Sequence, residues 1–102
     1  MAYTKQWAKT LSLEVWRYLR DHPSIEVKEQ LPTCLWERIK ELRCRCPLCE
    51  VLGTQTCSGC PLPLCVSERG RGVYANWLHA HSINKRYRAA CVIVKRIENW
   101  RV

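Results

Sequence analysis

Apolar residues recur at helical spacing in the first part of the chain. Thr10-Leu11-Ser12 leads into residues 13–20, whose apolar positions fall near i, i+3 and i+4, and His22-Pro23 stops the run. A hydroxyl cap at Thr10 or Ser12, an acid in the first turn and arginines near the end suit the helix dipole. The pattern therefore predicts a first helix between Thr10 and His22.

Residues 24–31 are polar, which predicts an irregular segment or a short turn of helix. Pro32-Thr33 then opens a second amphipathic segment, which ends as it meets Cys44. Its apolar stripe consists of Leu35, Trp36, Ile39 and Leu42.

The last third of the chain predicts two more helices. The first begins at Val73, and its shared face is made of Tyr74, Trp77, Leu78 and His81. Ser82-Ile83-Asn84 offers cap residues for a break. The stripe of the second helix consists of Tyr87, Ala90, Cys91, Val94, Ile97 and Arg101, where Cys91 is interpreted as a small buried hydrophobe.

Between these helical regions, residues 44–72 have no sustained apolar period. They hold six of the eight cysteines, three of the five prolines and all four glycines. A chain of 102 residues is about one domain's worth. The sequence thus predicts a single, mostly α domain over residues 1–102, with about four helices. Its parts are the N-terminal helices (10–43), an irregular Cys-rich insert with zinc knuckles (44–72) and basic C-terminal helices (73–102).

The insert carries two C-x-x-C pairs seven residues apart, the arrangement that lets two turns present four thiolates to one ion. The expected ligands are Cys46, Cys49, Cys57 and Cys60, and Cys65 could replace Cys57. Zn²⁺ is favoured over an iron–sulfur cluster, while redox-sensing thiols or disulfides are the alternatives to metal. Because four thiolates close the coordination sphere, the expected role of the metal is structural.

The net charge of +8 is concentrated near the C-terminus. Residues 1–68 carry nine basic and eight acidic side chains, whereas residues 69–102 carry eight basic side chains against Glu98 alone. These charges could simply keep the surface solvated. The functional interpretation is that they form a face for an anionic partner, either nucleic acid or an acidic protein surface. The candidate binding residues are Arg69, Arg71, Lys85, Arg86, Arg88, Lys95 and Arg96. Lys85, Arg88 and Lys95 recur at helical spacing, with Arg69 and Arg71 at the approach to the helix, and such a row fits phosphate contact without implying that bases are read.

No combination of residues predicts an active site, so we expect no enzyme. His79 and His81 stand at i and i+2 of an expected helix, which would point them to different faces. Gly70-Arg71-Gly72 lacks the surroundings of a phosphate-binding loop, and no small-molecule substrate is evident. No apolar run is long enough to span a membrane, and Met1–Trp7 has no signal-peptide pattern, so we expect a cytoplasmic protein.

The chain also resembles a family. The motifs that carry the resemblance are Leu11-Ser-Leu-Glu-Val-Trp16, Leu31-Pro32, Trp36, Ile39, Cys46-Pro-Leu-Cys49, Cys57-Ser-Gly-Cys60-Pro, Cys65, Tyr74 and Trp77. From about Leu11 to the end, these are similar to the small cysteine-rich proteins of tailed bacteriophages and prophages. The resemblance implies a metal-stabilised early or accessory protein in the host cytoplasm, with no defined activity.

Together these observations predict a small zinc-stabilised accessory or regulatory protein that binds nucleic acid through its C-terminal basic helix. The alternative hypothesis is a protein-binding inhibitor or adaptor that acts on a host defence or transcription complex. The salt dependence of binding to random DNA separates the two, because phosphate contacts release counterions.

Overall fold

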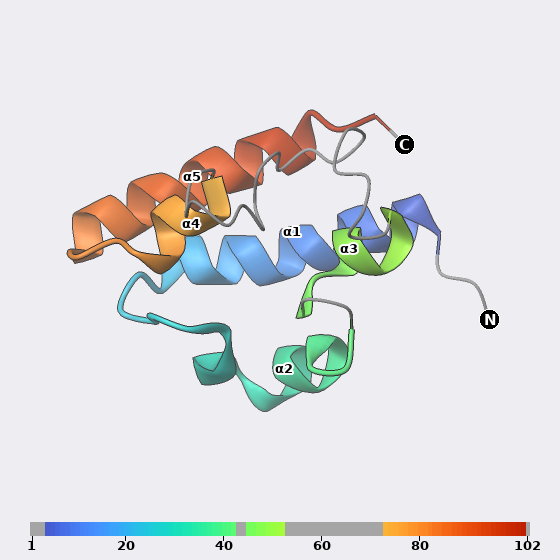
Figure 1. Ribbon diagram of the computed structural model, residues 1–102, viewed down its shortest axis with the longest axis horizontal. Coiled ribbons are helices and arrows are strands. Elements are labelled where there is room, and N and C mark those ends of the chain that lie inside the picture. The colour runs from blue at the N-terminus through green and yellow to red at the C-terminus, as the bar shows by residue number, and fades with distance from the viewer. Residues whose placement is uncertain (1–3, 43–44, 53–72, 102) are drawn as a thin grey trace.

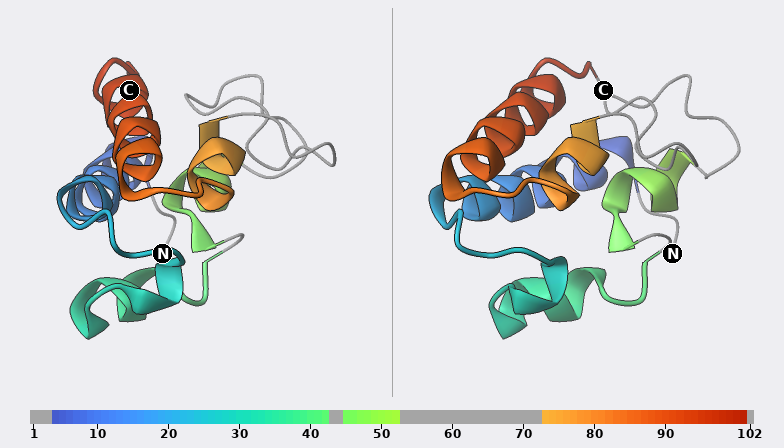
Figure 2. Two further views of the ribbon diagram at one scale, coloured as in Figure 1. Left: turned by 90° about the vertical axis from the view of Figure 1, so that its left-hand side faces the viewer. Right: turned by 60° about the vertical axis from the view of Figure 1, so that its left-hand side comes forward.

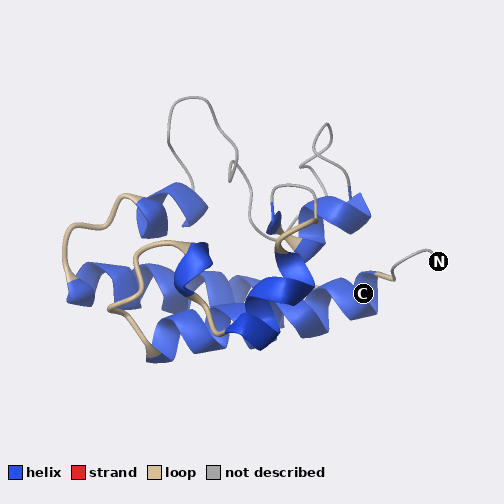
Figure 3. Cartoon of the chain, turned by 90° about the horizontal axis from the view of Figure 1, so that it is seen from below, coloured by secondary structure: helices blue, strands red, loops and turns tan. Residues whose placement is uncertain are grey.

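The computed structural model describes residues 4–42, 45–52 and 73–101, and its described part is helical without any strand (Figure 1; Figure 3). The mostly α fold class is confirmed. The elements in chain order are α1 (Lys5–Asp21), the 3-10 turn η1 (Lys28–Gln30), α2 (Thr33–Ile39), α3 (Pro47–Leu52), α4 (Val73–Leu78) and α5 (Ile83–Glu98).

Helix α1 begins earlier than predicted and ends where predicted. The Oγ1 atom of Thr4 accepts a hydrogen bond from the Trp7 amide at 3.0 Å, so Thr4 is the N-cap, and the predicted cap at Thr10 or Ser12 is wrong. Ser12 is instead fully buried within the helix, and the first turn contains no acid. At the other end, the His22 amide donates to the Tyr18 carbonyl and closes the helix.

The segment between α1 and α3 follows the sequence pattern closely. Residues 28–30 form a single 3-10 turn, and Pro32 precedes the first residue of α2. Ile39 is fully buried and the other stripe residues are half-buried. The helix itself stops at Ile39, before the predicted end at Cys44.

The predicted irregular insert contains a helix at its start. Residues 47–52 form α3, which begins with Pro47, a residue whose fixed φ suits the first helical position. Leu48 is fully buried in the same core as α1, and this tertiary burial holds a helix too short to be stable alone. The rest of the insert, residues 53–72, lies outside the described residues.

The core forms where α5 lies along α1 and α3 and α4 pack beside them (Figure 1; Figure 2). α1 and α5 run in opposite directions. The start of α1 lies beside the end of α5, where the Nζ atom of Lys9 donates to the carbonyls of Glu98 at 3.1 Å and Trp100 at 2.7 Å. This ammonium neutralises the negative end of the α5 dipole. In the middle of the core, the Trp16 and Trp77 rings meet edge to face with centroids 5.2 Å apart.

The last two helices differ from prediction in which faces they bury. Ser82 caps α5 as predicted, because its Oγ accepts from the Lys85 amide at 3.1 Å. The buried stripe of α5 is Arg86, Ala90, Ile93, Val94 and Ile97. Tyr87 and Arg101 are therefore exposed and Cys91 is half-buried, contrary to the predicted stripe. His81 follows the end of α4 and is exposed, so it does not share the face of Trp77.

Candidate nucleic-acid interface

The outer surface of α5 carries a row of basic side chains. Lys85, Arg88, Lys95 and Arg96 are all exposed and lie on the side of the helix away from its buried stripe. We call these four residues the basic face. Val92, whose exposed fraction is 46%, lies among them. Of the other predicted binding residues, Arg69 and Arg71 lie outside the described residues.

Arg86 does not belong to the basic face, which corrects the prediction for this residue. Its exposed fraction is 6%, because position 86 falls on the buried stripe of α5. The guanidinium donates to the carbonyls of Pro23 and Ala80, the second at 3.4 Å, and lies 3.6 Å from Glu26. Arg86 thus ties α5 to the segment that follows α1 and to the turn before α5, and it cannot meet a phosphate.

The four cations of the basic face have no acidic partner among the described residues, whereas several cations elsewhere do. Glu98, the one acid of the last third, pairs with Arg17 of α1 at 2.9 Å. The other exposed pairs are Arg38–Glu14, Lys40–Glu37, Arg45–Glu29 and Arg20–Asp21. The acids are therefore engaged on α1, η1, α2 and the far end of α5, and the positive potential of the basic face is not neutralised locally.

A groove lies beside the basic face, between α4 and α5. Its volume is about 470 Å³, within the range of small-molecule sites. Its lining consists of Ala75, Asn76, His79, Ala80, His81, Lys85, Arg88, Ala89 and Val92. His79 and His81 both line this α4–α5 groove. The prediction that they belong to a helix is wrong. The reason is that α4 ends at Leu78, and both histidines belong to the turn rather than to a helix.

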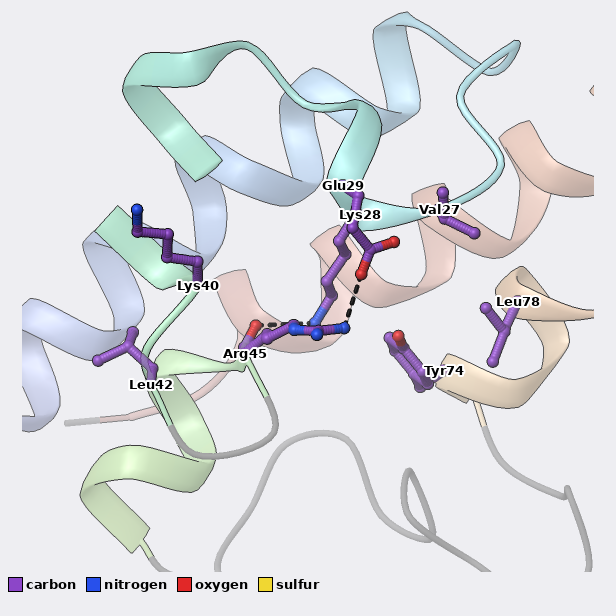
Figure 4. Close-up of a pocket in the computed structure, with 8 residues that line it drawn as sticks. All are labelled: Val27, Lys28, Glu29, Lys40, Leu42, Arg45, Tyr74 and Leu78. Atoms are coloured by element: carbon purple, nitrogen blue, oxygen red, sulfur yellow. Dashed lines mark hydrogen bonds and ion pairs between the residues drawn. The ribbon is translucent and has the colours of Figure 1, made fainter. Parts of the chain in front are cut away.

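A second cavity, of about 440 Å³, lies between η1, the segment that joins α2 to α3, and α4 (Figure 4). The Nζ atom of Lys28, a residue only 6% exposed, donates to the Arg45 carbonyl at 3.0 Å and lies 4.8 Å from the ring centroid of Tyr74. The Arg45 side chain pairs with Glu29 at 2.6 Å and stacks over Trp36. Because these cations are held by protein groups, the cavity is less suited to a phosphate than the basic face is.

Comparison of the chain with protein-family models, with curated proteins and with solved structures finds no match. Within the described ranges, no helix has both the length and the apolar character needed to cross a bilayer. Any functional assignment therefore depends on the chemistry of the residues themselves.

The predicted metal site falls largely on residues that the structure does not describe. Cys57, Cys60 and Cys65 lie outside the described residues, and for Cys49 only the backbone, within α3, is described. Cys46 is buried in the core directly before α3, and its carbonyl accepts from the Glu50 amide at 3.1 Å. Among described residues, no three His, Cys, Asp or Glu side chains come close enough to hold an ion.

The exposed Tyr87 and the half-buried Cys91 form a pair one turn apart on α5, on the flank next to the end of α1. A hydrogen bond with the Cys91 thiol raises the pKa of the Tyr87 phenol above its ordinary value. Nearby, a hydrogen bond to Asp21 raises the pKa of Arg20. Arg20 is therefore paired with Asp21. The cations on the outer side of α5 are the ones available to an anionic partner.

Sequence reasoning missed the groove and the buried lysine. The groove depends on where α4 ends, and a break between Leu78 and Ser82 carried no proline or glycine to mark it. From the sequence, Lys28 is expected to be one more exposed cation in a polar stretch. Only the fold places it between Trp16 and Tyr74. Val92, an apolar residue off the buried stripe, is a local signal of a contact surface on α5.

Proposed function

We propose that the protein binds nucleic acid through the basic face of α5. The observation that carries this proposal is that Lys85, Arg88, Lys95 and Arg96 are exposed on one side of one helix without an acidic partner in the described part of the chain. Long, flexible cations of this kind contact phosphate oxygens and position a protein on nucleic acid without reading its sequence.

The dimensions of the basic face suit a phosphate backbone. The twelve residues from Lys85 to Arg96 extend about 16 Å along the helix axis, which corresponds to about five base steps of 3.4 Å. If each of the four cations neutralises one phosphate of duplex DNA, log K should fall against log salt with a slope of about −3.6. Arg86 adds nothing to this slope, because it is buried.

The experiment is a salt titration of binding to random-sequence DNA, followed by fluorescence anisotropy. Lys85→Gln/Arg88→Gln should reduce the slope to about −1.8, since two of four phosphate contacts remain. Arg38→Gln/Lys40→Gln is the matched control, because it removes two exposed charges from α2, and it should leave the slope unchanged.

Two results would overturn the proposal. A slope near zero for the wild-type protein would exclude phosphate contact and favour the alternative function, an inhibitor or adaptor that binds an acidic protein surface. The exposed Val92 among the cations would suit such a partner, since protein interfaces combine apolar and charged contacts. Equal loss of slope in both double variants would show that net charge, rather than the basic face, controls binding.

We infer a structural zinc ion as the second part of the function, held by Cys46, Cys49, Cys57 and Cys60, or with Cys65 in place of Cys57. The burial of Cys46 beside the core residue Leu48 supports this role, because a metal bound there would connect the insert to the core that α1 builds. An iron–sulfur cluster is the alternative cofactor. The accessory role in a phage-infected cell follows from the family resemblance alone and stays a prediction.

A further inference from the structure

The α4–α5 groove combines an apolar interior with a polar and cationic rim. Its apolar lining residues are Ala75, which is buried, with Ala80, Ala89 and Val92. Lys85 and Arg88, which also belong to the basic face, line the groove together with His79 and His81 from the turn between α4 and α5. The groove therefore continues directly from the surface that the proposed function assigns to phosphates.

Arg86 holds the turn of this groove in place. Its guanidinium donates to the Ala80 carbonyl, which lies between the two histidines in sequence, and to the Pro23 carbonyl beyond the end of α1. Ser82 fixes the other side of the turn by capping α5. Because the backbone between α4 and α5 is bonded at both points, the groove is formed before any ligand binds, and little conformational entropy is lost on binding.

We propose that the α4–α5 groove receives an unpaired base of single-stranded nucleic acid whose phosphates contact Lys85 and Arg88. This inference rests on the proposed function and names its substrate class. Proteins that bind single strands combine a basic track for the backbone with flat rings or apolar surface for the bases, and histidine is among the rings on which bases stack. Asn76, His79 and His81 also supply hydrogen-bonding groups at the groove for the edge of a base.

Duplex DNA is expected to fit this combination of basic face and groove less well than a single strand. In a duplex the bases are stacked and paired, and a base can enter a side groove only after it is extruded, which costs free energy. A single strand presents its bases without that cost. The groove therefore favours single strands over duplexes of the same length, whereas the basic face alone would favour duplex DNA for its higher charge density.

The test compares binding of an oligothymidine with binding of an abasic oligomer of the same length, which carries the same phosphates. The wild-type protein should bind the oligothymidine about tenfold more tightly, the effect of stacking one base. Both oligomers should show a salt slope of about −2.8, the value for four phosphate contacts on a single strand. The ratio of the two affinities measures the groove, and the slope measures the basic face.

Two variants test the groove without changing the net charge of the basic face. Ala89→Leu fills the groove and should bring the affinity ratio to about one with the salt slope unchanged, whereas Asn84→Leu, on the same helix but outside the groove lining, should keep the ratio. His79→Ala/His81→Ala changes only exposed side chains, so it should fold like the wild type, and it should also lower the ratio. Circular dichroism checks the fold of each variant.

The outcomes separate this inference from the proposed function. An affinity ratio near one for the wild-type protein, with the salt slope retained, would refute the base site and leave phosphate binding in place. A ratio that stays at about tenfold in both groove variants would refute it as well. Absence of salt-dependent binding to either oligomer would overturn the proposed function, and the base site with it.

Discussion

Replacing Arg86 with alanine should destabilise the fold strongly, although the residue belongs to a run of cations that otherwise face solvent. The truncation removes the donors for the carbonyls of Pro23 and Ala80 and the buried stem of the side chain. Hydrogen bonds from a charged group contribute about 1.5 to 3 kcal/mol each. The bond to Ala80 is long at 3.4 Å, and Glu26 is mostly exposed, so both add less than a full bond. We expect a loss of about 3 kcal/mol in the free energy of unfolding.

Urea unfolding followed by circular dichroism measures this loss, and thermal unfolding should show Tm lower by about 12 to 24 °C. Arg88→Ala is the matched control, because it removes the same side chain from an exposed position two residues away, and it should change stability by no more than about 0.5 kcal/mol. If the two variants were equally stable, the Arg86 side chain would not stabilise the fold, and its assignment to the interior would be wrong.

Two further predictions concern the cysteines. Cys91→Ala removes the hydrogen bond that raises the pKa of Tyr87, so the tyrosine pKa should fall toward its ordinary value of about 10 in a spectrophotometric titration. Cys34→Ala is the control, because it removes an exposed thiol on α2, and it should leave the titration curve unchanged. A Cys91→Ala curve that overlays the wild-type curve would contradict the hydrogen bond. Metal analysis should find about one zinc per chain, and chelation should reduce helical content and compactness, because α3 would lose the support of the insert next to Cys46. Unchanged circular dichroism and unchanged hydrodynamic radius after complete zinc removal would refute the structural role of the metal.

The sequence predicted those features that depend on a local signal. Ser82 was recognised as a cap because a serine stands directly before a helical period, and the end of α1 was recognised from His22-Pro23. Thr4 was missed because the buried residues of α1 begin with Ala8, whose single methyl group gives a weak hydrophobic signal. Helix α3 was missed for a different reason, since it depends on the burial of Leu48 against distant residues, which no local pattern reveals.

The assignment of the binding residues failed at one position, and the cause is angular. Consecutive residues on a helix are 100° apart, so a run such as Lys85-Arg86-Tyr87-Arg88 must contain members on opposite sides. Which member is buried depends on the orientation of the stripe, and the apolar residues of α5 allowed two orientations that share Ala90, Val94 and Ile97. Ile93 decides between them, because its full burial turns position 86 inward and position 87 outward.

The distribution of charge pairs indicates that the fold increases the asymmetry already present in the sequence. Acids from the N-terminal part pair with cations of the same part, except Glu26, which faces Arg86, the buried cation among the described residues of the last third. Glu98 pairs with Arg17 of α1, away from the middle of α5. The exposed charge of α5 is thus purely positive from Lys85 to Arg96. A chain with the same net charge of +8 but with acids interspersed on this face would have no comparable attraction for phosphates, because neighbouring opposite charges cancel within a Debye length of about 8 Å.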